Sequence, residues 1–141
     1  MRVIDQFGWR YFVTDADPDF IADKVGKWMY FYGDDKGEAV AAEMCRKAVE
    51  NGVVAEAKYA PDSGSGVACF YLDGDDMAAH KRILTFFMEN NLIRKTKSGR
   101  YYDISFKRDE QTLSGEYGSG FKGELKLSRF IDLYTGEWIA G

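Results

Sequence analysis

Residues 98–118 read SGRYYDISFKRDEQTLSGEYG, and the prediction of the fold starts from this stretch. Its first half alternates between apolar and polar residues, as a half-buried strand does. The positions expected to face a core are Tyr102, Ile104 and Phe106. The positions expected on the opposite face are Tyr101, Asp103, Ser105 and Lys107, with Arg108, Asp109 and Glu110 directly after them. The stretch therefore predicts a strand that covers a core with one face and leaves its polar face open.

Four further strands and two helices are predicted along the chain. Residues 9–13, 26–33, 53–59 and 67–72 have strand composition and are bounded by turn residues. The stretch 26–33, GKWMYFYG, is largely apolar on both faces, so we expect it near the centre of the sheet. One helix is predicted from Asp34 or Asp35 to about Asn51, and a second over about residues 75–92. Residues 125–133 fit either a last strand or a short helix.

The order of these elements predicts the fold class. Strand pairs that are each followed by a helix are typical of α+β proteins. We expect a curved, mostly antiparallel sheet with two helices packed on one face and the other face partly open. A chain of 141 residues is expected to form a single domain over residues 1–141.

The composition limits the possible functions. The net charge is −4 and the hydrophobic fraction is 45%, which indicates a globular protein without a broad basic surface. General binding to nucleic acid is therefore not expected. No apolar run approaches the ~20 residues of a membrane span, and the first residues lack the pattern of a signal peptide. We expect a soluble, cytoplasmic protein without membrane contact, either a monomer or a homodimer paired through a sheet edge.

Metal and cofactor sites are not predicted. Cys45, Cys69 and His80 lack the number and spacing of zinc ligands, and we expect both thiols to be reduced. The acidic stretch 14–20, TDADPDF, lacks the glycine and closing glutamate of a calcium-binding EF-hand loop. His80 falls on the apolar stripe of the second helix, which indicates a packed core residue rather than a catalyst.

The open face of the predicted sheet collects several charged side chains. Its expected members are Lys27, Met29, Glu56, Lys58, Asp103, Ser105 and Lys107. Converging lysines can bind phosphate or carboxylate, and a crowded lysine can act as a base. The alternative is an ordinary solvated surface in which Lys58 pairs with Glu56 or Asp103. The basic loop 94–100, RKTKSGR, either adds phosphate contacts or is a solvated turn.

Several short motifs, taken together, resemble a known group of small domains. In chain order they are GKWMYF, an AK strand, CFY, a helix ending in ENNLI, and YDISFKRDEQTLSGEY, over about residues 26–117. The pattern is similar to the family of the basophilic-leukemia-expressed protein and to bacterial proteins of the phosphothreonine lyase domain type. The resemblance implies a fold like that of the messenger-RNA cap-binding translation factor, a curved antiparallel sheet backed by helices.

The resemblance to the phosphothreonine lyases also implies roles for individual residues. In those enzymes a lysine removes the Cα proton, a histidine protonates the leaving phosphate, and basic residues hold it. Lys58, in AKYAPD, matches the catalytic lysine, and Lys27 matches a phosphate-binding lysine. Lys107 or Arg108 falls where a phosphate-binding arginine lies. The histidine of the family is replaced by Met29, which cannot donate a proton.

Three functions are compatible with these observations. The leading expectation is a phosphate-recognising binding protein with a degenerate lyase-like site, for a phosphopeptide, a nucleotide-like ligand or another phosphorylated small molecule. The first alternative is an active phospholyase that performs β-elimination with Lys58 as base. The second is a protein-interaction or inhibitor module without a small-molecule site.

Overall fold

The protein is a seven-stranded antiparallel open sheet contacted by two helices, seen in a computed structural model that describes residues 1–62, 66–109 and 125–139. The strands are β1 (Arg2–Gln6), β2 (Trp9–Val13), β3 (Val25–Tyr32), β4 (Glu56–Tyr59), β5 (Gly66–Asp73), β6 (Ser105–Arg108) and β7 (Leu125–Lys126). The helices are α1 (Asp35–Glu50), α2 (Met77–Glu89) and the short 3-10 turn η1 (Leu127–Arg129). Their order in the sheet is β1-β2-β4-β5-β3-β6-β7, and the predicted fold class is confirmed.

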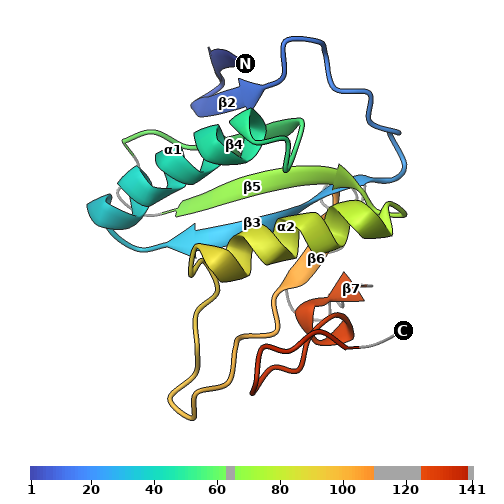
Figure 1. Ribbon diagram of the computed structural model, residues 1–141. Coiled ribbons are helices and arrows are strands. Elements are labelled where there is room, and N and C mark those ends of the chain that lie inside the picture. The colour runs from blue at the N-terminus through green and yellow to red at the C-terminus, as the bar shows by residue number, and fades with distance from the viewer. Residues whose placement is uncertain (63–65, 110–124, 140–141) are drawn as a thin grey trace.

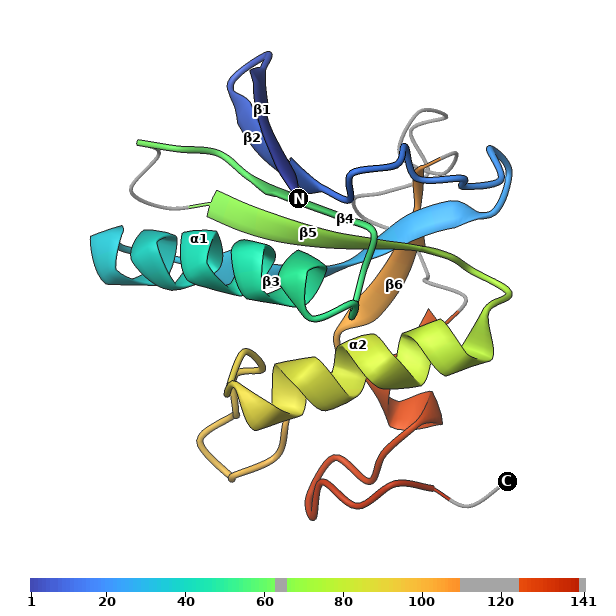
Figure 2. The same ribbon diagram turned by 45° about the horizontal axis from the view of Figure 1, so that its top comes forward.

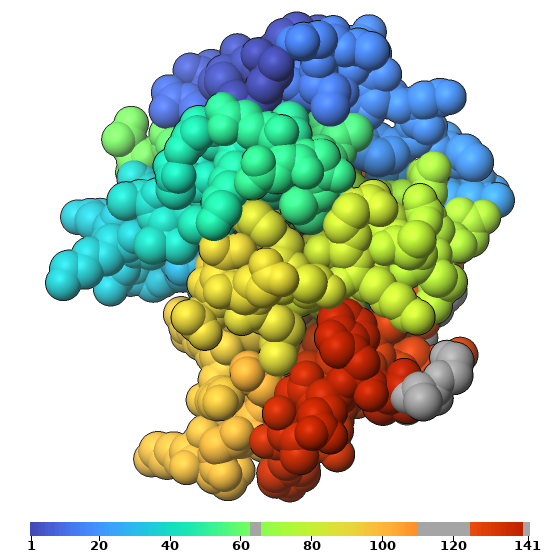
Figure 3. Space-filling model, viewed as in Figure 1, coloured from blue at the N-terminus to red at the C-terminus, as the bar shows by residue number. Residues whose placement is uncertain are grey.

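Both helices lie on the same face of the sheet, with α1 over β4 and β5 and α2 beside it (Figure 1). The strands at the two ends of the sheet run steeply across the direction of β5, which reflects the strong twist of the sheet (Figure 2). The space-filling view shows that α1 and α2 cover this side of the sheet (Figure 3). None of the described helices has the length and apolar character needed to cross a membrane.

Local sequence signals explain where the two helices begin and end. The Asp34 carboxylate accepts a hydrogen bond from the Gly37 amide at 2.7 Å, so Asp34 rather than Asp35 is the N-cap of α1. Asn51 caps the other end, and Gly52 follows with a positive φ of 72°. Asp76 caps α2 in the same way, through the Ala79 amide at 3.1 Å.

The core contains a hydrogen-bonded pair between β3 and α2. Trp28 is fully buried, and its indole N–H donates to Nδ1 of His80 at 3.0 Å. Nε2 of His80 lies 2.8 Å from the Gly74 carbonyl, so the neutral imidazole donates there. The rings of Phe106 and Phe130 pack against both side chains. His80 is therefore a core residue, as predicted.

Gly26 allows β6 to lie close to β3. A Cβ atom at this position would lie 2.4 Å from the Lys107 carbonyl oxygen and 2.5 Å from the Phe106 ring. Gly26 pairs with Arg108, and the next residue, Lys27, pairs with Lys107. The absence of a side chain at residue 26 thus supports the pairing that brings two lysines together.

The strand predicted from Tyr102 begins only at Ser105. The Tyr102 amide donates to the Arg94 carbonyl at 2.9 Å, and Asp103 accepts two hydrogen bonds from Ser128 at 2.8 Å. These contacts hold residues 101–104 outside the strand pairing of β6 with β3. Phe106 still faces the core as predicted, whereas Tyr102 is exposed.

Two further differences lie near the N-terminus and in β4. Strand β1 was not predicted, and it forms a hairpin with the predicted strand β2. The turn residues of this hairpin, Phe7 and Gly8, both have positive φ, as in a type I′ turn. The strand predicted over residues 53–59 begins at Glu56. Residues 63–65, between two of the predicted strands, and the end of the opening stretch from Glu110 to Gly118 lie outside the described residues.

The burial of His80 predicts an acid-sensitive stability. Burial lowers the pKa of His80, so the unfolded chain takes up a proton more readily than the folded one as the pH falls below about 6.5. The free energy of unfolding should then fall by up to about 1.4 kcal/mol per pH unit. Urea unfolding at about pH 7.5 and about pH 5.5 measures this dependence, because these two pH values bracket the usual histidine pKa.

His80→Gln is the matched variant for this measurement. Glutamine keeps a donor and an acceptor but does not titrate in this range. We expect it to be less stable than the natural protein and to show a smaller loss of stability between the two pH values. Equal losses in both proteins would contradict the assignment of a buried, neutral histidine.

Candidate functional site

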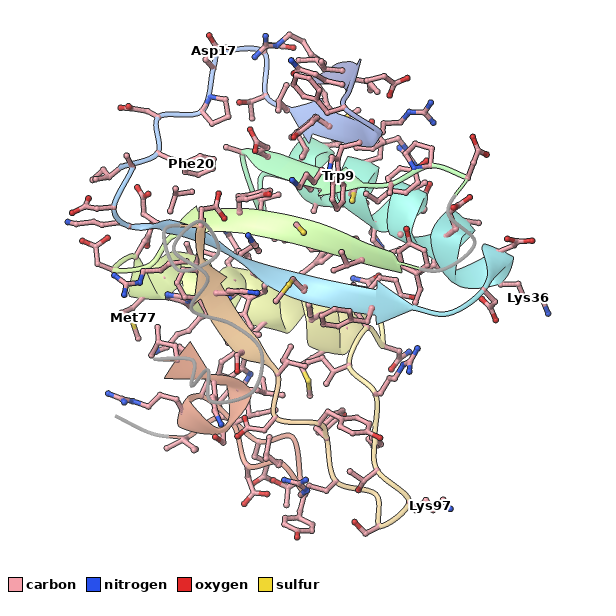
Figure 4. All side chains as sticks on the ribbon, turned by 180° about the vertical axis from the view of Figure 1, so that it is seen from behind. Trp9, Asp17, Phe20, Lys36, Met77 and Lys97 are labelled. Atoms are coloured by element: carbon pink, nitrogen blue, oxygen red, sulfur yellow. The ribbon has the colours of Figure 1, made fainter. Side chains whose placement is uncertain are left out.

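Three lysine side chains lie on the open face of the sheet, which is turned away from both helices. Strand alternation determines this side: Trp28 and Phe106 enter the core, so Lys27 and Lys107 lie on the opposite face. Lys58 on β4 lies on the same open face, between the buried residues 57 and 59. We refer to Lys58, Lys27 and Lys107 as the lysine row. Figure 4 views the molecule from this face.

The sheet register brings the lysine row together. Lys27 is directly opposite Lys107 on one side and Tyr71 on the other. Lys58 is directly opposite Cys69. Since opposed residues in antiparallel strands have Cβ atoms about 4.5–5.5 Å apart, Lys27 and Lys107 are immediate neighbours. Tyr71 and Cys69 of β5 separate this pair from Lys58.

Three aromatic rings surround the amine of Lys58. Its Nζ lies 4.1 Å from the ring centre of Trp9, 5.4 Å from that of Tyr11 and 5.8 Å from that of Tyr71. We refer to these three rings as the aromatic cage; Figure 4 labels Trp9 on this face. Ring faces attract an ammonium group, so the cage holds the charge of Lys58 in a defined place.

The aromatic cage was not predicted from the sequence. Its members Trp9 and Tyr11 alternate along β2, which places them on one face of that strand. The sequence contained this signal, but the pairing of β2 with β4, which sets Tyr11 opposite Lys58, follows only from the fold. In the alternative interpretation of this face, Lys58 was expected to pair with Glu56 or Asp103. Within the described part of the chain the Lys58 amine forms neither ion pair and lies against the rings, while Asp103 accepts hydrogen bonds from Ser128.

Lys27 has an acidic partner on the open face. Its Nζ lies 2.7 Å from Oδ1 of Asp109, just after β6. Only 12% of the Lys27 side chain is exposed, against 36% for Asp109. The pair is therefore partly desolvated, which strengthens its electrostatic interactions relative to a fully exposed ion pair.

The surroundings of Lys107 disfavour its charged form. Burial lowers the pKa of Lys107, and the neighbouring charge of Lys27 lowers it further. Both effects disfavour the ammonium form unless an anion is close by. An anion bound between Lys27 and Lys107 would relieve this repulsion.

Burial favours the neutral forms of three groups near the lysine row. Burial raises the pKa of the Cys69 thiol to about 11, although the nearby lysines act in the opposite direction. Burial also raises the pKa of Tyr71, whose ring is covered by Phe20 at 6.5 Å between ring centres. The pKa of Glu56 is raised by burial and lowered in part by Lys58. This part of the open face therefore has the character of a poorly hydrated surface.

The structure does not bring all of the predicted site residues together. Arg108 alternates with Lys107 and lies toward the helix side, where it lines a cavity of about 200 Å³ with Lys24 and Asp75. Met29 lies on the open face, two residues from Lys27. His80 is on the other side of the sheet, in the core, and cannot replace a histidine at the position of Met29.

Comparisons with known proteins add no further assignment. Neither the protein-family models nor the curated proteins give a match to this sequence. The resemblance to the phosphothreonine lyase domains therefore stays a prediction. Among the side chains that the structure describes, no group of three or more His, Cys, Asp or Glu residues is placed to hold a metal ion.

The coupling between Lys27 and Lys107 can be measured directly. In protein carrying ¹³C-labelled lysine, the Lys107 signal should titrate at a lower pH than the ordinary lysine side chain does. Lys27→Met should raise the pKa of Lys107, because it removes the neighbouring cation. Lys81→Met, on the outer face of α2, is the matched control and should leave the pKa of Lys107 unchanged. An unchanged Lys107 titration in Lys27→Met would show that the two amines are not neighbours.

Proposed function

We propose that the protein binds a phosphorylated ligand on the open face of its sheet, with the phosphate between Lys27 and Lys107. The observation that carries the proposal is their direct opposition across β3 and β6. Two neighbouring amines can both donate hydrogen bonds to the oxygens of one phosphate, whose negative charge also offsets their mutual repulsion. Lys58 provides a third positive charge across β5.

Two carboxylates lie near the lysine row. Asp109 pairs with Lys27, and Glu56 is shifted by burial toward its neutral form. A phosphate bound beside this ion pair would add negative charge next to the lysines at a surface where little water competes for it.

The role proposed for Lys58 is to bind rather than to act as a base. The Lys58 amine lies against the rings of Trp9 and Tyr11, and ring faces attract a cation, so we assign the side chain to holding an anion rather than to removing a proton. The position expected for a proton donor holds Met29, and loss of a general acid lowers the rate by roughly 10²–10⁴-fold. We therefore favour a binding protein with a degenerate lyase-like site over an active phospholyase.

The proposal is tested by thermal unfolding with inorganic phosphate, a phosphothreonine peptide and mononucleotides. A ligand at 100 times its dissociation constant should stabilise the protein by about 2.7 kcal/mol, which is a shift of several degrees. We expect at least one of these ligands to give such a shift. We also expect Lys107→Ala and Lys58→Ala to reduce it, and Lys81→Ala on α2 to leave it unchanged.

Mass spectrometry of the phosphothreonine peptide after incubation distinguishes binding from catalysis. We expect recovery of the intact phosphopeptide without the elimination product. Formation of that product, lost in Lys58→Ala, would instead establish the phospholyase. No shift with any phosphorylated ligand, or equal shifts in all variants, would refute the phosphate site.

A further inference from the structure

A second feature of the open face is an apolar cleft beside the lysine row. The cleft, of about 470 Å³, lies between the end of β3 and the segment that leads into β6. Its lining includes Met29, Phe31, Arg94, Tyr102 and Ile104. Phe31 and Tyr102 leave 52% and 49% of their surface exposed. Large, half-exposed rings around a concave surface are typical of a place where a partner side chain binds.

A basic hairpin rises from the rim of this cleft. Residues 94–102 form a narrow hairpin, with Lys95 bridged to Tyr101 and the Tyr102 amide bonded to the Arg94 carbonyl. The tip is Lys97, which Figure 4 shows far from the sheet. The basic residues of the hairpin are Arg94, Lys95, Lys97 and Arg100. In a protein of net charge −4, this is a local concentration of positive charge.

These positive charges are not neutralised within the described part of the chain. The ion pairs recorded among the described residues involve none of the four basic residues of the hairpin. Lys95 instead lies over the ring of Tyr101, 4.7 Å from its centre. The acidic residue in the cleft lining, Asp103, is engaged by the amide and hydroxyl of Ser128. The surface is therefore complementary to a negatively charged partner.

Backbone hydrogen bonds hold the hairpin in a defined conformation. Thr96 donates its amide to the Arg100 carbonyl at 2.7 Å, and Gly99, with a φ of 86°, donates to Thr96 at 2.9 Å. The Tyr101 amide bonds to the Leu133 carbonyl at 2.8 Å, which joins the hairpin to the C-terminal segment beside it (Figure 3). A rigid surface loses little conformational entropy on binding.

We propose that the cleft and the basic hairpin form a docking surface for an acidic peptide segment of a partner protein. One apolar side chain of the segment occupies the cleft between Phe31 and Tyr102. The acidic residues around it lie against Arg94 and the hairpin. The charge complementarity identifies the segment as acidic, and the half-exposed rings identify its anchor as an apolar side chain. This surface uses neither the lysine row nor a phosphate, so it does not depend on the proposed function.

Isothermal titration calorimetry with synthetic peptides tests the proposal. The probes are short capped peptides of glutamates and aspartates with a central phenylalanine or leucine. The control peptides replace the central residue by glycine, or every acidic residue by lysine. We expect the acidic peptides with an apolar centre to bind, the glycine peptide to bind at least about tenfold more weakly, and the lysine peptide not to bind. Higher salt should weaken binding, because the charges are exposed.

Surface variants locate the binding. Phe31→Ala and Arg94→Glu should each weaken the affinity for the phenylalanine peptide at least about tenfold. Lys81→Glu makes the same charge reversal as Arg94→Glu, but on the outer face of α2, and should leave the affinity nearly unchanged. Circular dichroism confirms that each variant is folded. No binding of either acidic peptide at millimolar concentration, or equal affinities in all variants, would overturn the proposal.

Discussion

The hydrogen bonds from Trp28 to His80 and from His80 to Gly74 fix the arrangement of the sheet and the second helix. Both side chains are fully buried, so each ring nitrogen requires a partner inside the protein. The imidazole provides the acceptor for the indole and donates to a backbone carbonyl at the turn before α2. One neutral histidine therefore joins β3, α2 and the connection between β5 and α2.

The same constraint determines the chemistry of the open face. With Trp28 in the core, strand alternation places Lys27 and Met29 on the opposite side of β3. Gly26 then lets β6 approach closely enough for Lys107 to stand opposite Lys27. The lysines are neighbours because the core and the backbone register hold them there, and this preorganisation is what an anion site needs.

Much of the architecture could be predicted from local patterns, but the site could be predicted only in part. The apolar periodicities identified β3, β5, α1 and α2, because their buried faces repeat every two or about 3.6 residues. That the three lysines of the lysine row share one face of the sheet could be predicted, because alternation along a strand is a local property. The cage around Lys58 requires the pairing of β2 with β4, which is set by tertiary packing. Asp103 was predicted within the strand but lies before β6, and its hydrogen-bond partner Ser128 is 25 residues away in the sequence.

The central claim is that a phosphate binds between Lys27 and Lys107. The most direct test is to titrate inorganic phosphate into protein carrying ¹³C-labelled lysine and to follow each lysine signal by NMR. The account predicts that the signals of Lys27 and Lys107 shift together and saturate with one affinity, with a smaller shift of Lys58. The signals of Lys81 on α2 and Lys97 at the hairpin tip should stay in place. Uniform shifts of all lysines, or shifts confined to the hairpin, would contradict the account.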